Sequence, residues 1–195
     1  MSEFVPVHPS PIATAFTTTA RSPSRPKGFS TGTRARRVAT IGVYGFSAES
    51  FLAKLRAARV GRVLDVRQRR CVRGPQYSWA NSRRLQAALA QAGVTYEHHR
   101  ELAPTTELRH LQYAEDARLG VGKRSRELLA PEYRRRYLAE ILDRVDLSPL
   151  ADSLTSGPLA ALLCVERDPQ ACHRSLIATR LSADYGADVT DLLPA

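Results

Sequence analysis

The chain has 195 residues, and 43% of them are hydrophobic, which is enough for one ordinary domain with its own core. No apolar run is long enough for a transmembrane helix, so the sequence predicts no membrane association. The formal net charge is +10, and only three of the 29 basic residues are lysine. Arginine forks suit phosphate and carboxylate groups. Three cysteines, an odd number, do not suit a secreted disulfide framework, so we expect reduced thiols and a cytoplasmic location.

The first 37 residues differ from the rest of the chain. They are rich in Pro, Ser, Thr and Arg, and they carry six basic residues against one acidic residue, Glu3. Such a segment cannot bury enough apolar surface to offset the entropy of ordering, so we expect residues 1–37 to be disordered. A basic arm that binds nucleic acid is one interpretation. A transit peptide or a solvated extension is the alternative.

Residues 38–195 alternate between short apolar runs and helical patterns, which predicts a single α/β domain. The expected strands cover residues 38–41, 63–66, 94–97, 159–164 and 189–192. The expected helices begin near Ser47, Asn81 and Cys172, and a helical insertion at about residues 105–145 includes a helix opened by Pro131. This alternation predicts a mostly parallel sheet covered by helices, a Rossmann-like three-layer fold with the insertion before the 159–164 strand.

The densest group of reactive side chains follows the expected strand at residues 159–164. It consists of Cys164, Glu166, Asp168, Cys172, His173 and Arg174. Ligands of open α/β sheets bind at the carboxyl ends of the strands. A helix N-terminus also offers free N–H groups to an anion. We therefore expect an anion pocket at the start of the helix near Cys172, with His173 and Arg174 as binding residues.

Each of these groups has a chemical and a structural interpretation. Cys172, beside two cationic side chains at a helix N-terminus, suits a thiolate nucleophile, but it also suits a packed first-turn residue, and Cys164 suits the core. Glu166 and Asp168 suit acid–base work, although Asp168 can simply brace the helix start. A zinc site at Cys164, Cys172 and His173 lacks a Cys-x-x-Cys pair and a clear fourth ligand, so we predict no metal, and the cofactor stays unknown.

Two further loops carry candidate binding residues. Asp65 lies in an otherwise apolar strand, where a carboxylate needs a partner. The arginine-rich loop after it ends in two aromatic residues, a combination that suits phosphate contacts and base stacking. The alternative is a solvated loop whose aromatic residues fold back on the core. The binding residues expected from the loops after the first and second strands are Tyr44, Arg67, Arg70, Tyr77 and Trp79.

These landmarks, in this order, resemble the family called Domain of Unknown Function 488. The most specific piece is Cys-x-Glu-x-Asp-Pro-x-x-Cys-His-Arg at residues 164–174, supported by Leu64-Asp65-Val66-Arg67 and Gly93-Val94-Thr95-Tyr96. The resemblance covers about residues 38–193 and implies a compact bacterial or archaeal α/β domain with no settled activity. The chain has Gly42-Val43-Tyr44 where family members typically carry Gly-His-Ser, which suggests a subgroup with a different ligand.

The first functional hypothesis is an enzyme that acts on a phosphate-bearing substrate, a nucleotide or nucleic acid. In it, Arg67, His173 and Arg174 hold the anion, Glu166 and Asp65 act on a sugar or base, and Cys172 is a candidate nucleophile. One alternative is a non-catalytic nucleic-acid-binding module that uses the basic tail and the arginine-rich loop. The other is a thiol- or sulfur-handling protein that uses Cys172.

Overall fold

The computed structural model describes residues 35–122 and 124–195. Within these ranges, five parallel strands form one sheet in the order β3-β2-β4-β1-β5. The strands are β1 (Arg37–Ile41), β2 (Val60–Asp65), β3 (Thr95–His98), β4 (Leu159–Leu163) and β5 (Asp188–Leu192). The predicted parallel α/β sheet is therefore confirmed. The expectation of a disordered basic arm falls on residues that, up to position 34, lie outside the described residues.

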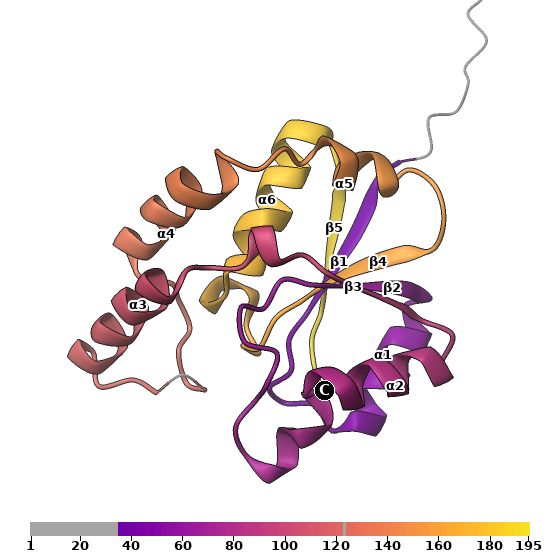
Figure 1. Cartoon of the computed structure of the whole chain (residues 1–195), viewed down its shortest axis with the longest axis horizontal. Helices are drawn as coiled ribbons and strands as arrows, with labels where there is room; N and C mark the ends of the chain where they lie inside the picture. The colour runs from indigo at the N-terminus through magenta and orange to yellow at the C-terminus, as the bar shows by residue number, and fades with distance from the viewer. Residues whose placement is uncertain (1–34, 123) are drawn as a thin grey trace, which may run out of the picture. The chain divides into compact units, whose positions relative to one another are not determined.

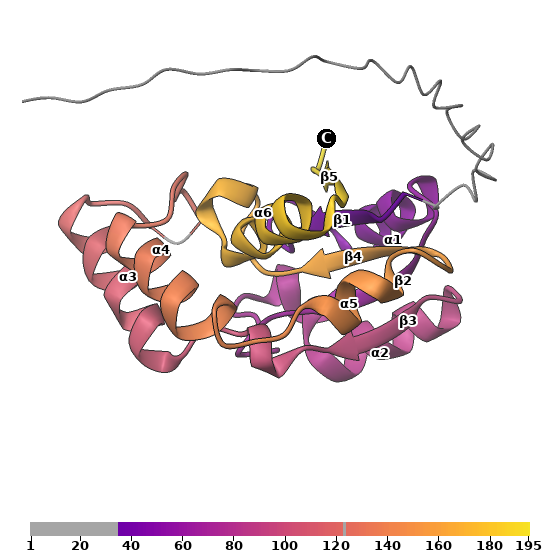
Figure 2. The same ribbon diagram turned by 90° about the horizontal axis from the view of Figure 1, so that it is seen from above.

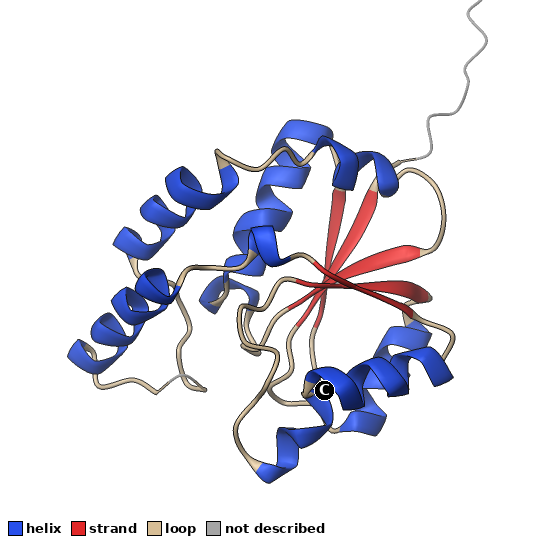
Figure 3. Ribbon diagram, in the orientation of Figure 1, coloured by secondary structure: helices blue, strands red, loops and turns tan. Residues whose placement is uncertain are grey.

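Helices cover both faces of the sheet (Figures 1 and 3). One face carries α1 (Ala48–Ala57) and α2 (Ser82–Gln91), and the other carries α3 (Thr106–Arg118), α4 (Pro131–Tyr137), α5 (Ser148–Ser153) and α6 (His173–Tyr185). Each face has its own hydrophobic core, because alternate residues of the buried strands point to opposite sides. The predicted three-layer arrangement is confirmed. No helix among the described residues is long and apolar enough to span a bilayer.

Helix boundaries follow local sequence signals. Ser47 caps α1 in a reciprocal hydrogen-bonded pair with Ser50, and Pro131 opens α4, as expected. The wider turn at Leu138–Leu142 is π-helical. The start of β1 lies one residue earlier than expected. Arg36, which we expected in the tail, pairs with Asp152 instead.

The insertion places helices beyond the carboxyl ends of the strands. Helices α3 and α4 lie side by side there, in both views of the molecule (Figures 1 and 2). The connection between them folds back toward the sheet. The Leu129 N–H donates a hydrogen bond to the Gln170 carbonyl in the turn between β4 and α6. This connection therefore forms a wall opposite the strand ends.

Strand order brings three loops together at that end of the sheet. Because β4 lies between β1 and β2, Leu163 is level with both Ile41 and Asp65. Gly42 packs against the turn after β4 so closely that a Cβ there would overlap the carbonyl oxygen of Glu166. The glycine therefore lets the loop after β1 approach the turn after β4.

Candidate functional site

A cavity of about 790 Å³ lies at the carboxyl ends of β1, β2 and β4. Its inner part, which we call the floor, consists of Cys164, Glu166, Cys172 and His173. Its outer part carries four exposed or half-buried arginines, which we call the arginine rim, namely Arg69, Arg73, Arg109 and Arg124. Four of the six residues in the predicted cluster after β4 therefore lie at the inner end of this cavity, and Asp168 and Arg174 do not line it.

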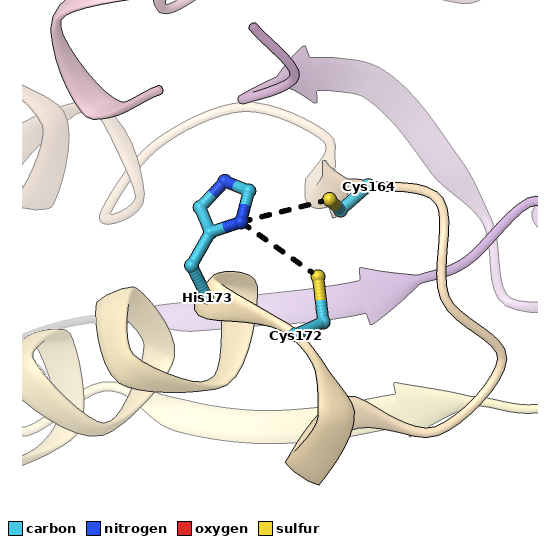
Figure 4. Close-up of side chains that lie close together, drawn as sticks. All are labelled: Cys164, Cys172 and His173. Carbon is cyan, nitrogen blue, oxygen red and sulfur yellow. Dashed lines mark hydrogen bonds between the residues drawn. The ribbon is translucent and has the colours of Figure 1, made fainter. Parts of the chain in front are cut away.

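Three floor residues form a compact triangle, which Figure 4 shows. Cys164 follows β4, Cys172 is the N-cap of α6, and His173 is the first residue of that helix. The Nδ1 atom of His173 lies 3.7 Å from Sγ of Cys164 and 3.9 Å from Sγ of Cys172. The three atoms all lie within 4.8 Å of one another. On the far side of the ring, Nε2 of His173 lies 2.9 Å from the carbonyl oxygen of Val66.

The two thiols have opposite electrostatic surroundings. Burial alone would raise the pKa of the Cys172 thiol, but the hydrogen bond with Cys164 and the positive charges of Arg174 and His173 lower that pKa well below its ordinary value. Burial and the neighbouring Cys172 raise the pKa of Cys164 well above its ordinary value. For His173, burial lowers the pKa, but the charge of Cys172, the hydrogen bonds with Cys172 and the Val66 carbonyl, and the charge of Glu166 together raise it, and the net shift is upward. The surroundings of the triangle therefore favour the charged forms of Cys172 and His173.

Glu166 borders the triangle and contacts a buried arginine that is itself paired with an aspartate. Its Oε2 lies 3.7 Å from Sγ of Cys164, and its Oε1 lies 3.6 Å from Nη1 of Arg126. Burial, followed by the charge of Cys172, raises the pKa of Glu166 to about 7 against the opposing charge of Arg126. Arg126 in turn donates hydrogen bonds to both carboxylate oxygens of Asp116.

Sequence reasoning missed Arg126 and Asp116. A usable signal did exist, because Leu108, Gln112 and Asp116 recur every four residues on the buried face of α3. A polar pair on such a face needs partners. The Gln112 amide donates a hydrogen bond to Asp116, and its carbonyl accepts one from the Ala130 N–H. The buried face of α3 therefore fixes the connection between α3 and α4, and that connection carries Arg126.

The predicted anion-binding role of Arg174 requires correction. This side chain is fully buried beneath the turn after β4. Its Nη1 and Nη2 donate to the carbonyl oxygens of Glu166 and Arg167, and its Nε donates to the hydroxyl of Thr40. Arg174 does not line the cavity. It fixes the backbone that carries Glu166, because the carbonyls of a tight turn have no partners within the turn itself.

The predicted site residues Asp65 and Arg67 are paired with each other, although Arg67 also lines the cavity. Oδ1 and Oδ2 of Asp65 accept from Nε and Nη2 of Arg67 at 2.8 and 2.6 Å, and Oδ2 also accepts from the hydroxyl of Tyr96 at 2.6 Å. Nη1 of Arg67 donates to the carbonyl of Ala80. Arg70 contacts this network through Tyr96 at 3.5 Å rather than lining the cavity. These residues hold the end of β2 rather than presenting free groups to a ligand.

The predicted aromatic residues separate into two places. Tyr44 lines the cavity and stacks near Tyr77, with ring centroids 5.0 Å apart, and the guanidinium of Arg124 lies over both rings. Trp79 instead packs on Phe51 in the α1–α2 layer, where the second cavity measures about 170 Å³. Its predicted stacking role at the main site is therefore wrong.

Asp168 was expected to work beside Glu166. Its side chain is exposed and forms no hydrogen bond or ion pair within residues 35–122 and 124–195. It does not line the cavity. The tight turn after β4 points Glu166 inward, whereas Asp168 lies exposed at the N-cap of the short helical turn Pro169–Ala171.

Comparison with known proteins bears on this site at the level of the family. The family model described as "Domain of unknown function DUF488" matches residues 47–181, which include the motif at residues 164–174 but leave out β1 and β5. The match is narrower than the expected range of 38–193. No curated protein and no solved structure shows a significant match. On the extent of the family match, the chain belongs to the DUF488 family, a domain of unknown function.

Proposed function

We propose that this protein is an enzyme that acts on a phosphate-bearing substrate, a nucleotide or nucleic acid, bound in the cavity at the end of the sheet. The observation that carries the proposal is the division of the cavity into two parts. The mouth consists of the arginine rim and Tyr44, with Tyr77 beside it, and the floor consists of reactive groups. A volume of about 790 Å³ suits a ligand of nucleotide size, because small-molecule sites commonly measure about 300–1,000 Å³.

The arginine rim supports the choice of an anionic substrate. Arg69, Arg73 and Arg124 are exposed and form no ion pair with any described acidic residue. Eight of the other twenty described arginines have such partners, for example Arg126 with Asp116, so what distinguishes these three is that they line one cavity. Unpaired guanidinium groups that converge on one cavity favour phosphate, which they bind through two parallel hydrogen bonds.

The two tyrosines at the mouth support an aromatic base as part of the substrate. Tyr44 and Tyr77 already stack with the guanidinium of Arg124, 5.6 and 5.3 Å from the ring centroids. A nucleobase uses the same ring faces, and stacking of this kind tolerates every base. The arrangement therefore supports nucleotide binding without selecting a base.

The floor supports a reaction rather than binding alone. A carboxylate, an imidazole and two thiols meet at the inner end of the cavity, where a substrate held by the rim would extend. Groups of these types provide proton transfer and nucleophilic attack. Glu166 is the residue we place beside the reacting bond, since the pair of Arg126 and Asp116 fixes its position.

Binding is tested by titrating the full chain with nucleoside monophosphates and single-stranded oligonucleotides at several salt concentrations. We expect Arg124→Gln to weaken binding and to reduce the salt dependence by about one counterion. Arg83→Gln is the matched control, because Arg83 is an exposed arginine on α2, on the other side of the sheet. Equal losses from both variants would reject a specific site at the mouth.

Turnover is tested with Glu166→Gln, which keeps the size of the side chain but replaces the carboxylate by a neutral amide. We expect this variant to retain ligand binding and to lose product formation, followed by mass spectrometry of nucleotides and oligonucleotides incubated with the protein. If the wild-type chain binds with a steep salt dependence and converts none of them, the non-catalytic nucleic-acid-binding module replaces the enzyme.

A further inference from the structure

We infer that Cys164, Cys172 and His173 bind a zinc ion whose fourth coordination position faces the cavity. The inference concerns the floor alone. It does not depend on the identity of the substrate, because zinc binding can be measured without any substrate. For the proposed enzyme, the inference adds a metal ion to the groups at the floor of the cavity.

The spacing of the three ligand atoms matches a tetrahedral zinc site. With Zn–S bonds of about 2.3 Å and Zn–N bonds of about 2.05 Å, tetrahedral angles separate sulfur from nitrogen by about 3.6 Å. The two sulfur-to-Nδ1 distances here are 3.7 and 3.9 Å. A small inward movement of Cys172 and Cys164 would place all three atoms on one ion.

The histidine is oriented as a metal ligand. Nε2 of His173 lies 2.9 Å from the carbonyl oxygen of Val66, so Nε2 carries a hydrogen and Nδ1 is the nitrogen turned toward both sulfurs. Metal-bound histidines usually donate their other ring N–H to a carboxylate or a backbone carbonyl, which fixes the tautomer and the ring plane. The tilted ring of Tyr137 packs against the imidazole, with 5.3 Å between centroids, and adds a second restraint.

The ligand types and their surroundings favour zinc among the divalent ions. Two thiolates and an imidazole are soft or intermediate donors, which disfavours magnesium and calcium. All three side chains are buried yet line the cavity, so an ion reaches them from one side only. Sites with three protein ligands leave one exchangeable position, as in catalytic zinc centres, whereas closed structural sites use four.

Glu166 occupies the place next to that open position. Its Oε2 approaches Cys164 to 3.7 Å, but Glu166 is not part of the group of atoms that lie within 4.8 Å of one another. Arg126 and Asp116 hold it there. When bound, zinc would polarise a phosphate or carbonyl oxygen at the floor, and Glu166 would stand beside that oxygen.

The test uses the full chain, stripped with a chelator under reducing conditions, reloaded with Zn²⁺ or Co²⁺ and desalted. We expect one ion per chain by elemental mass spectrometry, and a cobalt spectrum with a thiolate charge-transfer band and the strong visible bands of a tetrahedral site. Cys172→Ser and His173→Gln are expected to lose stoichiometric binding. Cys71→Ser is the matched control, because Cys71 is an exposed cysteine outside the triangle.

A second measurement on the wild-type chain guards against variants that fail to fold. Zinc is expected to slow the alkylation of Cys164 and Cys172, mapped by peptide mass spectrometry, and to leave Cys71 unchanged. The inference is overturned if the folded wild-type chain retains no zinc or cobalt, or if Cys172 is alkylated equally fast with and without zinc. The second result would favour a metal-free thiolate. Nucleotide binding at the arginine rim can succeed or fail independently of either result.

Discussion

The turns after β2 and β4 lie side by side and both bury ionisable groups, but they use them in opposite ways. After β2, Asp65 and Arg67 satisfy each other with two hydrogen bonds and pass their remaining capacity to Tyr96 and a backbone carbonyl. After β4, Cys164, Cys172 and His173 turn their sulfur and nitrogen atoms toward one another at the inner end of the cavity. The first group uses its donors and acceptors within the protein, whereas the second brings three potential ligand atoms together beside the cavity.

This difference teaches that burial and charge do not by themselves mark a reactive site. A buried ion pair whose every donor and acceptor is used fixes the backbone, since removing either partner leaves an uncompensated charge. A buried group with unused coordinating atoms that open on a cavity is where chemistry can occur. We therefore propose that the turn after β2 is a structural support, the frame, and that the turn after β4 is the working part, which carries the chemistry.

Asp65→Asn should give the largest loss of stability, because it leaves the Arg67 guanidinium buried without its counter-charge. We expect a loss of about 3–5 kcal/mol in the free energy of unfolding. Denaturant titration followed by circular dichroism measures it. If the variant unfolds at the wild-type denaturant concentration and yet loses turnover, Asp65 acts in the reaction and not in stability. That result would contradict the distinction between the two turns.

Arg174→Gln should give the next largest effect, because it leaves the carbonyls of Glu166 and Arg167 without their charged donor. Hydrogen bonds to charged groups contribute about 1.5–3 kcal/mol, so we expect a loss of that size. The same titration measures it. Arg174 also positions the turn that carries Glu166, and turnover should therefore fall together with stability. Unchanged stability together with weakened phosphate binding would instead support the original prediction that Arg174 binds the substrate.

Cys172→Ser should cost less stability in the metal-free protein, about 1 kcal/mol, the typical cost of a point substitution. Its main consequence should appear in metal binding and turnover, which we expect to be lost. Thermal unfolding of the metal-free chain, compared with Cys71→Ser, measures the stability cost. A loss of stability as large as that of Asp65→Asn would show that Cys172 has a mainly structural role.

Arg124→Gln should change the free energy of unfolding by less than about 0.5 kcal/mol, because Arg124 is exposed. It should weaken nucleotide binding about tenfold, the equivalent of one charged hydrogen bond. Isothermal titration calorimetry with a nucleoside monophosphate measures the affinity. An unchanged affinity would move the phosphate away from the mouth of the cavity.

Local signals in the sequence predicted much of the fold. Ser47 and Pro131 mark helix starts through their own backbone preferences, and the apolar run before Cys164 indicated a buried strand. The motif at residues 164–174 likewise predicted which turn carries the floor, because its residues are neighbours in the chain.

Pairing between side chains could not be predicted, because it depends on tertiary contacts. Asp65 and Arg67 are two residues apart, yet spacing alone does not tell whether they face each other or a ligand. Arg126 reaches Glu166 only because the connection after α3 folds back over the strand ends. The spacing of Cys164 and Cys172 disfavours zinc by the usual sequence patterns, but the tight turn between them brings both sulfurs to His173.

A crystal structure of the full chain grown with Zn²⁺ and a nucleoside monophosphate, with data collected at the zinc absorption edge, tests the central claim most directly. We expect an anomalous peak among Cys164, Cys172 and His173, and a phosphate held by the arginine rim. A zinc-free triangle together with a nucleotide bound elsewhere, for example beside Trp79, would contradict the assignment of the turn after β4 as the working part of the molecule.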